Sequence, residues 1–441
     1  MHDVLDPSEM LADELTQRRE SGYEVSAAED LVQEALGGST VEKFERAWGA
    51  LEATQQRDDW PYEEPTAHDD ILAILPQAPD IPSSRLDDAE LRDRLLAAWL
   101  GRCAGCNLGK PVEGWTRERI RRYGELTDAY PIEDYLPMAD DAPEDLRLHG
   151  NWPDTTRGNV RFMARDDDID YTILGLHILE EHGPGFDPMD VAAEWLDHLP
   201  FNQVYTAERA AYRNLTRGKV APETASYRNP YREWIGAQIR GDMWGYVSPG
   251  DPARAARLAY KDASLSHTQN GIYGELWAAA LIAASFVTDD VSQALQISLA
   301  HVPPRSRLAE AVRDSMELHR SGLDWERARD AIEDRYYARY SFVHTVNNAA
   351  VIAAALLWGA RDFSRTIGLA VQGGWDTDCT GATAGSVFGA MHGTEALPPN
   401  WIDPLNDLIR SAIMGYDHSK PSELADRTLS LVGRDRVAHS S

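Results

Sequence analysis

Cysteine is scarce in this sequence, whose 441 residues include three: Cys103, Cys106 and Cys379. An odd and low number provides no disulfide framework and fits a reducing compartment. Cys103 and Cys106 have the spacing of half a zinc or redox site, but a tetrahedral zinc ion needs two more soft ligands and no second pair exists. The two thiols are therefore interpreted as small apolar side chains at a helix end.

Basic residues are also few. Lys and Arg number 43 against 72 Asp and Glu, which gives a formal net charge of −29. This excludes generic binding of duplex nucleic acid, because a phosphate backbone needs a basic surface. It also argues against docking on an anionic membrane surface. A small anionic ligand stays possible if local cations, backbone N–H groups or metal ions surround it.

The sequence has no hydrophobic run long enough to span a bilayer. The longest apolar runs, at 276–287 and 349–360, predict buried helices instead. Residues 1–20 carry acidic side chains where a signal peptide would have a basic stretch and an apolar run, so no targeting segment is predicted. The expected setting is the cytoplasm, without a membrane partner.

Alternating strand patterns are scarce, and helical periodicity dominates from residue 169 onward. We expect helices over 169–182, 188–199, 205–217, 252–262, 272–287, 290–300, 304–320, 324–338, 345–359, 362–371, 379–391, 401–413 and 420–432. The segment 116–160 is interpreted as a long loop over one end of the helices. These patterns predict an all-α fold without a fixed-period repeat.

Two parts of the chain are distinguished. Residues 1–84 predict a helical N-terminal extension with a Pro-rich linker, and residues 85–441 a single main domain. The extension has few large apolar residues: Val32, Leu36, Phe44, Trp48 and Leu51. Ser84 or Asp87 is expected to cap the first helix of the main domain, which carries Leu91, Leu95, Leu96, Trp99 and Leu100 at helical spacing.

A run of acidic residues, Asp166, Asp167, Asp168 and Asp170, precedes an apolar helical pattern. Exposed N–H groups at a helix start favour carboxylates, so capping explains one or two of the four. Capping does not explain the remaining acidic residues, because adjacent carboxylates repel one another and raise one another's pKa. A solvated acidic surface is the alternative in a chain of this charge.

A second acidic pair lies in the Gly-rich segment 373–381, where Asp376 and Asp378 open an Ala/Gly-rich helix. A turn that presents two carboxylates is suited to a hard cation such as Mg²⁺, Mn²⁺ or Ca²⁺. The alternative is a turn in which Asp378 only caps the helix. Two acidic clusters at helix starts favour one shared site for two cations over two coincidences.

A third segment, residues 105–115, is a Gly-rich loop that contains Glu113 between Val112 and Trp115. A carboxylate held against apolar groups has a raised pKa and can exchange a proton with water or a leaving group. Lys110 in the same loop can neutralise an anionic ligand. The alternatives are a surface acid and a solvated lysine.

Together, these three segments resemble the ADP-ribosylglycohydrolase family. The family pattern has an early Gly-Asp-x-x-Gly-x-x-x-Glu loop, a Thr/Ser-Asp-Asp-Thr run at a helix start and a late Gly-Gly-Asp-Thr-Asp-Thr turn. The sequence matches this order over about residues 90–395. The resemblance implies a compact all-α domain with two Mg²⁺ ions (or Mn²⁺) between helix ends. In the family these cations hold ribose hydroxyls and a water molecule, and the glycosidic bond at the anomeric carbon is hydrolysed.

The resemblance also implies roles for individual residues. It implies metal ligands at Asp166, Asp167, Asp168, Asp376, Asp378 and Cys379. It implies catalytic roles for Glu113, which handles the proton or the water, and for Asp168 among the carboxylates that stabilise positive charge at the anomeric carbon. It implies substrate contacts at or near His267, with Asn270 and Gly271 beside it, and we add Asp242, Tyr246, Lys110, Gly374 and Trp375 as substrate-binding candidates. Without the resemblance, His267, Asn270 and Gly271 can equally form a turn into a helix.

Several positions depart from the family pattern and indicate a divergent branch. Asp166 replaces a Thr or Ser ligand, Ile169 the second Thr of the same run, and Cys106 the early loop Asp. Trp375 stands between the Gly pair and Asp376, and Cys379 replaces a Thr or Ser although sulfur is a poor ligand for Mg²⁺. Residues 242–246 differ from the family's usual substrate loop.

The expected function is metal-dependent hydrolysis of an N- or O-glycosidic bond at the ribose of an ADP-ribosyl, nucleotide or nucleoside substrate, small or protein-linked. One alternative is a phosphoester hydrolase, because paired carboxylates around two cations also suit attack at phosphorus. A second is a non-catalytic ADP-ribose or nucleotide binder, and a third is an acidic helical scaffold. The leaving group, the oligomeric state and the role of residues 1–84 are left open.

Overall fold

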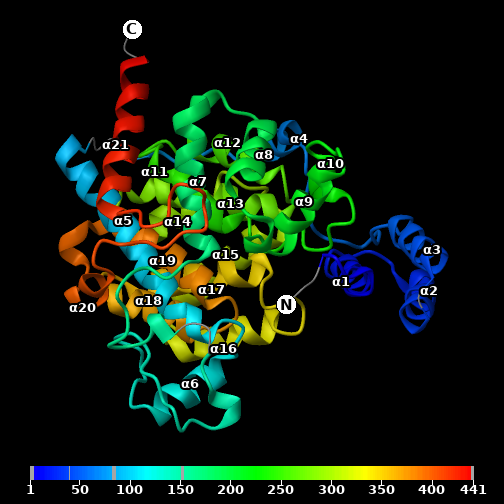
Figure 1. Ribbon diagram of the computed structural model, residues 1–441, viewed down its shortest axis with the longest axis horizontal. Coiled ribbons are helices and arrows are strands. Elements are labelled where there is room, and N and C mark those ends of the chain that lie inside the picture. Colours follow the sequence, from blue (N-terminus) through cyan, green and yellow to red (C-terminus); the bar gives the residue numbers. More distant parts are fainter. Residues whose placement is uncertain (1–3, 39, 82–85, 150–152, 439–441) are drawn as a thin grey trace.

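The computed structural model describes residues 4–38, 40–81, 86–149 and 153–438, and it confirms the all-α fold. In these segments the chain forms α-helices and short 3-10 helices, with β-contacts only as isolated bridges. The α-helices, shown in Figure 1, are α1 (Pro7–Glu20), α2 (Ser26–Gly37), α3 (Val41–Glu52), α4 (His68–Ile74), α5 (Asp88–Gly109), α6 (Arg117–Leu126), α7 (Asp167–His182), α8 (Pro188–His198), α9 (Thr206–Thr216), α10 (Glu223–Ser226), α11 (Gly241–Tyr246), α12 (Pro252–Ala263), α13 (Asn270–Ser285), α14 (Val291–Leu299), α15 (Arg307–Arg320), α16 (Trp325–Tyr336), α17 (Thr345–Gly359), α18 (Phe363–Gln372), α19 (Thr377–His392), α20 (Pro399–Ile402) and α21 (Pro421–Ala438).

The two longest apolar runs form buried helices, as predicted. Every residue of α13 and every residue of α17 is buried. A helix that is apolar on all sides belongs in the interior, and other helices surround these two. No helix in the described part of the chain has both the length and the apolar composition that crossing a membrane requires.

Helices α5 and α19 pack against each other without intervening side chains. A Cβ atom at Gly101, Gly105 or Gly109 of α5 would collide with the backbone of Gly385, Gly381 or Thr377 of α19, respectively. The contacts recur every four residues in opposite directions along the two helices, so the helices are antiparallel. This packing places the C-terminal end of α5 beside the N-terminal end of α19.

The start of α5 agrees with the sequence. Asp87 caps the helix by accepting a hydrogen bond from the amide of Glu90 at 2.9 Å. Leu91, Leu95 and Trp99 are fully buried. The other candidate cap, Ser84, lies outside the described residues.

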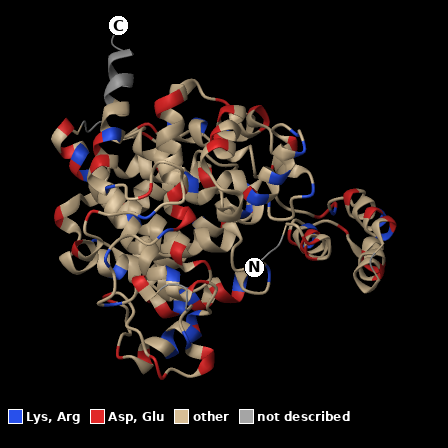
Figure 2. Cartoon of the chain, viewed as in Figure 1, with Lys and Arg blue, Asp and Glu red and all other residues tan. Residues whose placement is uncertain are grey.

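Helices α1–α3 form a small apolar cluster at one side of the molecule (Figure 1). Val32, Trp48 and Leu51 are buried in it, and the cluster continues into Tyr231 and Trp234 of the main body. The following segment lies along the start of α15, where Arg307 forms an ion pair with Glu64 at 2.9 Å. The N-terminal extension is therefore packed on the main body. Acidic side chains occur throughout both parts, with Lys and Arg interspersed (Figure 2).

Three predictions about secondary structure are wrong. Residues 105–115 are not one loop, because α5 continues to Gly109 and a 3-10 helix follows over residues 110–112. Residues 116–160 are not one loop, because α6 forms at its start with Thr116 as its cap. Residues 401–413 are not one helix. Asn406 and Asp407 adopt positive φ angles of 51° and 49°, which end the helical path, and Ile409 forms isolated bridges with Met163 and Ser419 instead. Apolar spacing alone does not reveal such local backbone reversals.

Candidate active site

The two acidic clusters lie at the N-terminal ends of α7 and α19. Asp166 is the N-cap of α7, and one of its oxygens accepts a hydrogen bond from the amide of Asp168 at 3.0 Å. Asp376 occupies the N-cap position of α19 but makes no side-chain capping bond. The alternative in which Asp378 merely caps a helix is therefore wrong, since Asp378 lies inside the first turn. The Asp376 side chain therefore does not serve as a cap of α19.

The Glu113 loop is joined to the start of α19 by backbone pairing. The amide of Trp375 donates to the carbonyl of Trp115 at 2.9 Å, and the amide of Gly114 donates to the carbonyl of Trp375 at 2.8 Å. Thr377 Oγ1 adds a bond to the carbonyl of Gly109 at 2.8 Å. This pairing fixes Glu113 beside the acidic end of α19.

A cavity of about 320 Å³ brings the three segments together. It is lined by these site residues predicted from the sequence: Lys110, Glu113, Asp166, Asp167, Asp376, Asp378 and Cys379. Asp168 lies beside it, fully buried, with one carboxylate oxygen within 4.8 Å of ligand atoms of Asp166 and Cys106. Residues some two hundred positions apart thus share one cavity.

Burial and mutual repulsion disfavour the ionised form of most carboxyl groups in the cavity. Burial, then the charge of Asp166, raises the pKa of Asp167 to about 8. The charge of Asp378, then burial, raises the pKa of Glu113 well above its ordinary range. Burial also raises the pKa of Asp168, Asp376 and Asp378. The cavity therefore contains more carboxyl groups than the nearby positive charges can neutralise.

The side chains of Lys110 and Arg102 offset part of this negative charge. The ammonium group of Lys110, which is buried, donates to Asp166. Although burial opposes ionisation, this contact holds the pKa of Asp166 below its ordinary value. The buried guanidinium of Arg102 lies 3.1 Å from Oδ1 of Asp168 and 2.8 Å from Oδ2 of Asp242.

Two carboxylate oxygens have no partner. Oδ2 of Asp168 and Oδ1 of Asp378 are buried and accept no hydrogen bond. An unsatisfied buried carboxylate oxygen is costly, and a hard divalent cation is the partner that such oxygens suit. Ligand atoms lie within 4.8 Å of one another in two groups, Asp166–Asp168–Cys106 and Asp376–Asp378–Cys379. The donor set fits divalent cations, with the thiols as its weakest members for Mg²⁺.

Comparisons with known proteins identify the family of this chain. The family model described as ADP-ribosylglycohydrolase matches residues 87–437. The chain belongs to the ADP-ribosylglycohydrolase family. This membership assigns it to a family of glycohydrolases.

One relative in this comparison is an uncharacterised protein of Archaeoglobus fulgidus. It is 27% identical over 316 residues, which cover 70% of this chain and 90% of the relative. A solved structure described as an ADP-ribosylglycohydrolase-related protein complex is similar with a TM-score of 0.50 at 22% identity, covering 78% of this chain and 99% of the solved one. At this identity the structural likeness supports the fold of the ADP-ribosylglycohydrolase family and nothing finer.

Other candidates suggested by the ADP-ribosylglycohydrolase resemblance lie behind the cavity wall. His267 is fully buried, with Nδ1 2.8 Å from Ser266 Oγ and Nε2 3.9 Å from Oε1 of Glu208, which itself lines the cavity. Gly271 packs against the His267 ring. Asn270 donates to Glu233 at 2.8 Å, on the side of the N-terminal extension. None of the three lines the cavity.

Asp242 and Tyr246 form a buried network on the far side of Arg102. The hydroxyl of Tyr246 lies 3.3 Å from Asp242 and 2.7 Å from Ser386. Because Arg102 bonds both Asp242 and Asp168, this network orients Asp168 from outside the cavity.

Gly374 and Trp375 belong to the support of the cavity. Both have positive φ angles, 74° and 70°, and the Trp375 ring lies 4.1 Å from the guanidinium carbon of Arg329. A positive φ angle at a tryptophan is a strained backbone conformation, and the backbone pairing of Trp375 with Trp115 maintains it. The ring is buried and packed on Arg329.

The cavity also contains residues that the sequence analysis missed. They are Arg165, Tyr205, Thr206, Glu208, Trp234, Ile235, Gly236, Ile239, Phe342 and Val343. Arg165 precedes the acidic run and bonds Asp170 at 2.8 Å, so its position was a usable signal. The aromatic residues come from loops remote in sequence, and no periodicity marks them.

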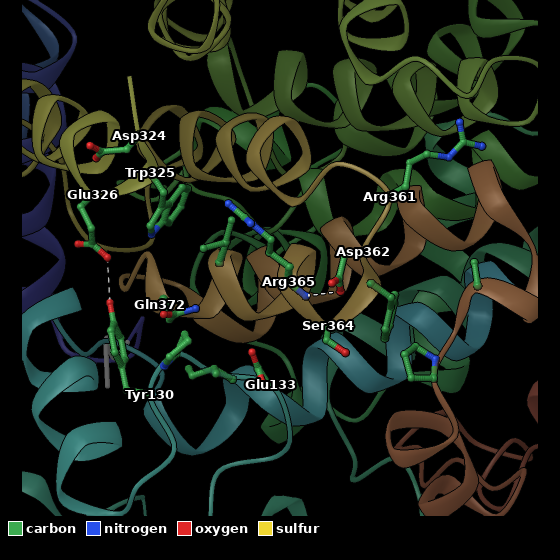
Figure 3. A pocket seen from close by; sticks show the side chains of 16 residues that line it. Tyr130, Glu133, Asp324, Trp325, Glu326, Arg361, Asp362, Ser364, Arg365 and Gln372 are labelled. Atoms are coloured by element: carbon green, nitrogen blue, oxygen red, sulfur yellow. Dashed lines mark hydrogen bonds between the residues drawn. The ribbon is translucent and has the colours of Figure 1, made fainter. Parts of the chain in front are cut away.

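A larger cavity of about 970 Å³ contains none of the predicted site residues (Figure 3). Two hydrogen bonds join residues that line it: the hydroxyl of Tyr130 donates to Glu326 at 3.0 Å, and Asp362 caps α18 by accepting from the backbone amide of Arg365. Size alone does not identify the chemical site.

Proposed function

We propose that this chain is a metal-dependent glycohydrolase that cleaves an N- or O-glycosidic bond at the ribose of an ADP-ribosyl, or related nucleotide or nucleoside, substrate. The observation that carries the proposal is the pair of unsatisfied oxygens on Asp168 and Asp378, contributed by different helices beside one cavity. Asp166, Asp167 and Asp168 would hold metal on one side, and Asp376 and Asp378 on the other. Because the candidate ligands form two groups, we propose two bound ions, either Mg²⁺ or Mn²⁺.

Bound cations would supply ribose-hydroxyl binding and a more acidic water molecule. Glu113 holds or moves the proton. Its raised pKa keeps the carboxyl group protonated nearer neutral pH, as a general acid requires, and deprotonation makes it a base toward water. The backbone pairing of residues 114–115 with Trp375 keeps this carboxyl in place.

Cleavage of a glycosidic bond develops positive charge at the anomeric carbon. The carboxylates around the cavity stabilise that charge, with Asp168 oriented by Arg102. The cavity continues from the carboxylates to Tyr205, Trp234 and Phe342. These aromatic residues provide an apolar wall for a base or an aglycone and exclude water there.

The test is a substrate panel with the full chain in Mg²⁺ or in Mn²⁺. Arginine-linked, serine-linked and O-acetyl ADP-ribose are compared with nucleosides, and products are followed by mass spectrometry. A free sugar hemiacetal supports the proposal. Inorganic phosphate or a phosphomonoester without free sugar would indicate a phosphoester hydrolase. Tight binding of ADP-ribose without turnover of any substrate would indicate a binding protein.

A further inference from the structure

A second cluster of ligating side chains lies between α7 and α8, outside the carboxylate cavity. Nε2 of His177 and Nδ1 of His198 each lie 2.9 Å from the same carboxylate oxygen, Oε2 of Glu194. The rings of His177 and His198 are 4.4 Å apart. Nε2 of His182 lies 2.7 Å from the other oxygen, Oε1. Three imidazoles therefore converge on one carboxylate.

Hydrogen bonding does not account for all of these contacts. His177 and His182 form hydrogen bonds to Glu194. Nδ1 of His198 is buried and has no hydrogen-bond partner, although it lies so close to the carboxylate. A nitrogen that close to an oxygen, without hydrogen-bond geometry, is the arrangement that a shared cation would explain.

We propose that His177, Glu194 and His198 bind one divalent cation of the borderline class, with Zn²⁺ as the preferred ion. Two imidazole nitrogens and one carboxylate oxygen are the donors that suit Zn²⁺ and related transition metals. Their ligand atoms all lie within 4.8 Å of one another. Zn–N and Zn–O distances of about 2.1 Å correspond to separations of about 3.4 Å between ligands of a tetrahedron, so the observed 2.9 Å contacts need to open by only about 0.5 Å.

The surroundings of the cluster orient its ligands. Nδ1 of His177 lies 2.9 Å from the hydroxyl of Tyr416, and Arg427 donates to the same hydroxyl at 3.2 Å. A metal-bound histidine commonly bonds a polar group through its other nitrogen, which fixes the ring. The side chain of Glu194 is 12% exposed and that of His198 is 27% exposed, so an ion can enter from solvent. His182 either keeps its hydrogen bond to Oε1 of Glu194 or binds the cation as a further ligand.

This site is separate from the proposed catalytic metals. His177 lies nine residues after Asp168 on α7, which is about 14 Å along a helix, too far to share an ion. The donors also differ in kind, because the catalytic cavity offers mainly carboxylate oxygens. The inference is thus independent of the proposed function. The ion would join the C-terminal half of α7 to α8.

The test uses the full chain freed of metal by a chelator and kept in excess Mg²⁺, which competes for the carboxylate cavity. Zn²⁺ is titrated, and retained zinc is measured by elemental analysis after desalting. We expect one tightly held zinc ion per chain and a higher melting temperature. His198→Asn should weaken Zn²⁺ binding by roughly tenfold or more, since loss of even an outer-shell partner costs roughly 10- to 100-fold.

His418→Asn is the control, because this exposed histidine pairs with Asp417 rather than with Glu194 and should leave zinc binding unchanged. Equal zinc retention in the wild type and in His198→Asn overturns the proposal. If His198→Asn does not fold, X-ray absorption of the wild type with one equivalent of Zn²⁺ decides. Scattering from two imidazoles supports the site, and an oxygen-only shell overturns it.

Discussion

Gly105 of α5 lies against Gly381 of α19 so closely that a Cβ atom on either residue would collide with the carbonyl oxygen of the other. This contact is one step of the antiparallel packing that ends where Gly109 meets Thr377. The acidic end of α19 and the Glu113 loop are neighbours because the two backbones touch. The geometry of the site therefore depends on glycines, which have no side chain that could bind a ligand or take part in a reaction.

Gly105→Ala should destabilise the fold and the site together. The methyl group has no space, and overpacking of an interior costs about 1–3 kcal/mol or more. Chemical denaturation should show the loss of stability, and a smaller thermal shift with divalent cations should show that the proposed metal site is weakened. Gly49→Ala in α3 is the matched control, since a Cβ there meets nothing within 4 Å. The control should gain about 0.5–1 kcal/mol from helix propensity. Equal effects of the two substitutions would contradict this account of the packing.

Glu113→Gln should abolish turnover and preserve metal binding. The amide keeps the shape of the side chain and removes the transferable proton, and general acid–base groups contribute roughly 10²- to 10⁴-fold to rates. The measurements are kcat on the substrate found by the panel and the thermal shift produced by Mg²⁺. Glu133→Gln in the larger cavity is the control and should leave both unchanged. Full activity of Glu113→Gln would remove Glu113 from the mechanism.

The sequence was sufficient for the fold class and for three of the segments that line the candidate cavity. Apolar periodicity located α7, α13 and α17, and the acidic runs pointed to the two helix starts that meet at the cavity. Such signals are local, because periodicity and charge repulsion act between residues close in the chain.

Contacts between distant segments could not be predicted in the same way. The wall residues Trp234 and Phe342 come from loops, where side-chain direction depends on tertiary packing. The glycines of α5 and α19 recur every four residues in the sequence, but this spacing does not indicate which two helices pack against each other. His267 was placed at the site by resemblance, whereas it lies behind Glu208.

Lys110→Met should destabilise the metal-free protein and increase its response to Mg²⁺. Lys110 is the cation that offsets the buried charge of Asp166, and removal of one partner of a buried ion pair costs about 3–5 kcal/mol. A divalent cation can then replace the missing charge. Denaturant unfolding at neutral pH, with and without Mg²⁺, measures both effects. Lys219→Met is the control, since its partner Glu223 is exposed and such pairs contribute about 0–1 kcal/mol. A Mg²⁺ response no larger than that of the wild type would contradict the compensation.

The metal-free protein should lose stability as pH rises from about 5 to about 8. The pKa of Asp167 is raised from 3.8 to about 8, so the folded state holds a proton that the unfolded state has already released. Stability then falls with pH across this interval, because the folded state binds more protons. Glu113 and Asp376 act in the same direction. Asp166, with its lowered pKa, contributes the opposite sign only at lower pH.

Saturating Mg²⁺ should reverse this trend. Cations bind the ionised carboxylates, so the Mg²⁺-induced rise in melting temperature should grow as the pH increases. Asp167→Asn removes one of the protons involved and should flatten the decline of the metal-free protein, whereas Asp145→Asn on the exposed surface should not. Melting temperatures at several pH values, with chelator and with Mg²⁺, provide the comparison. A metal-free protein whose stability is constant or rises over this range would show that these carboxyl groups are not held protonated. The excess of buried negative charge would then no longer support a metal centre.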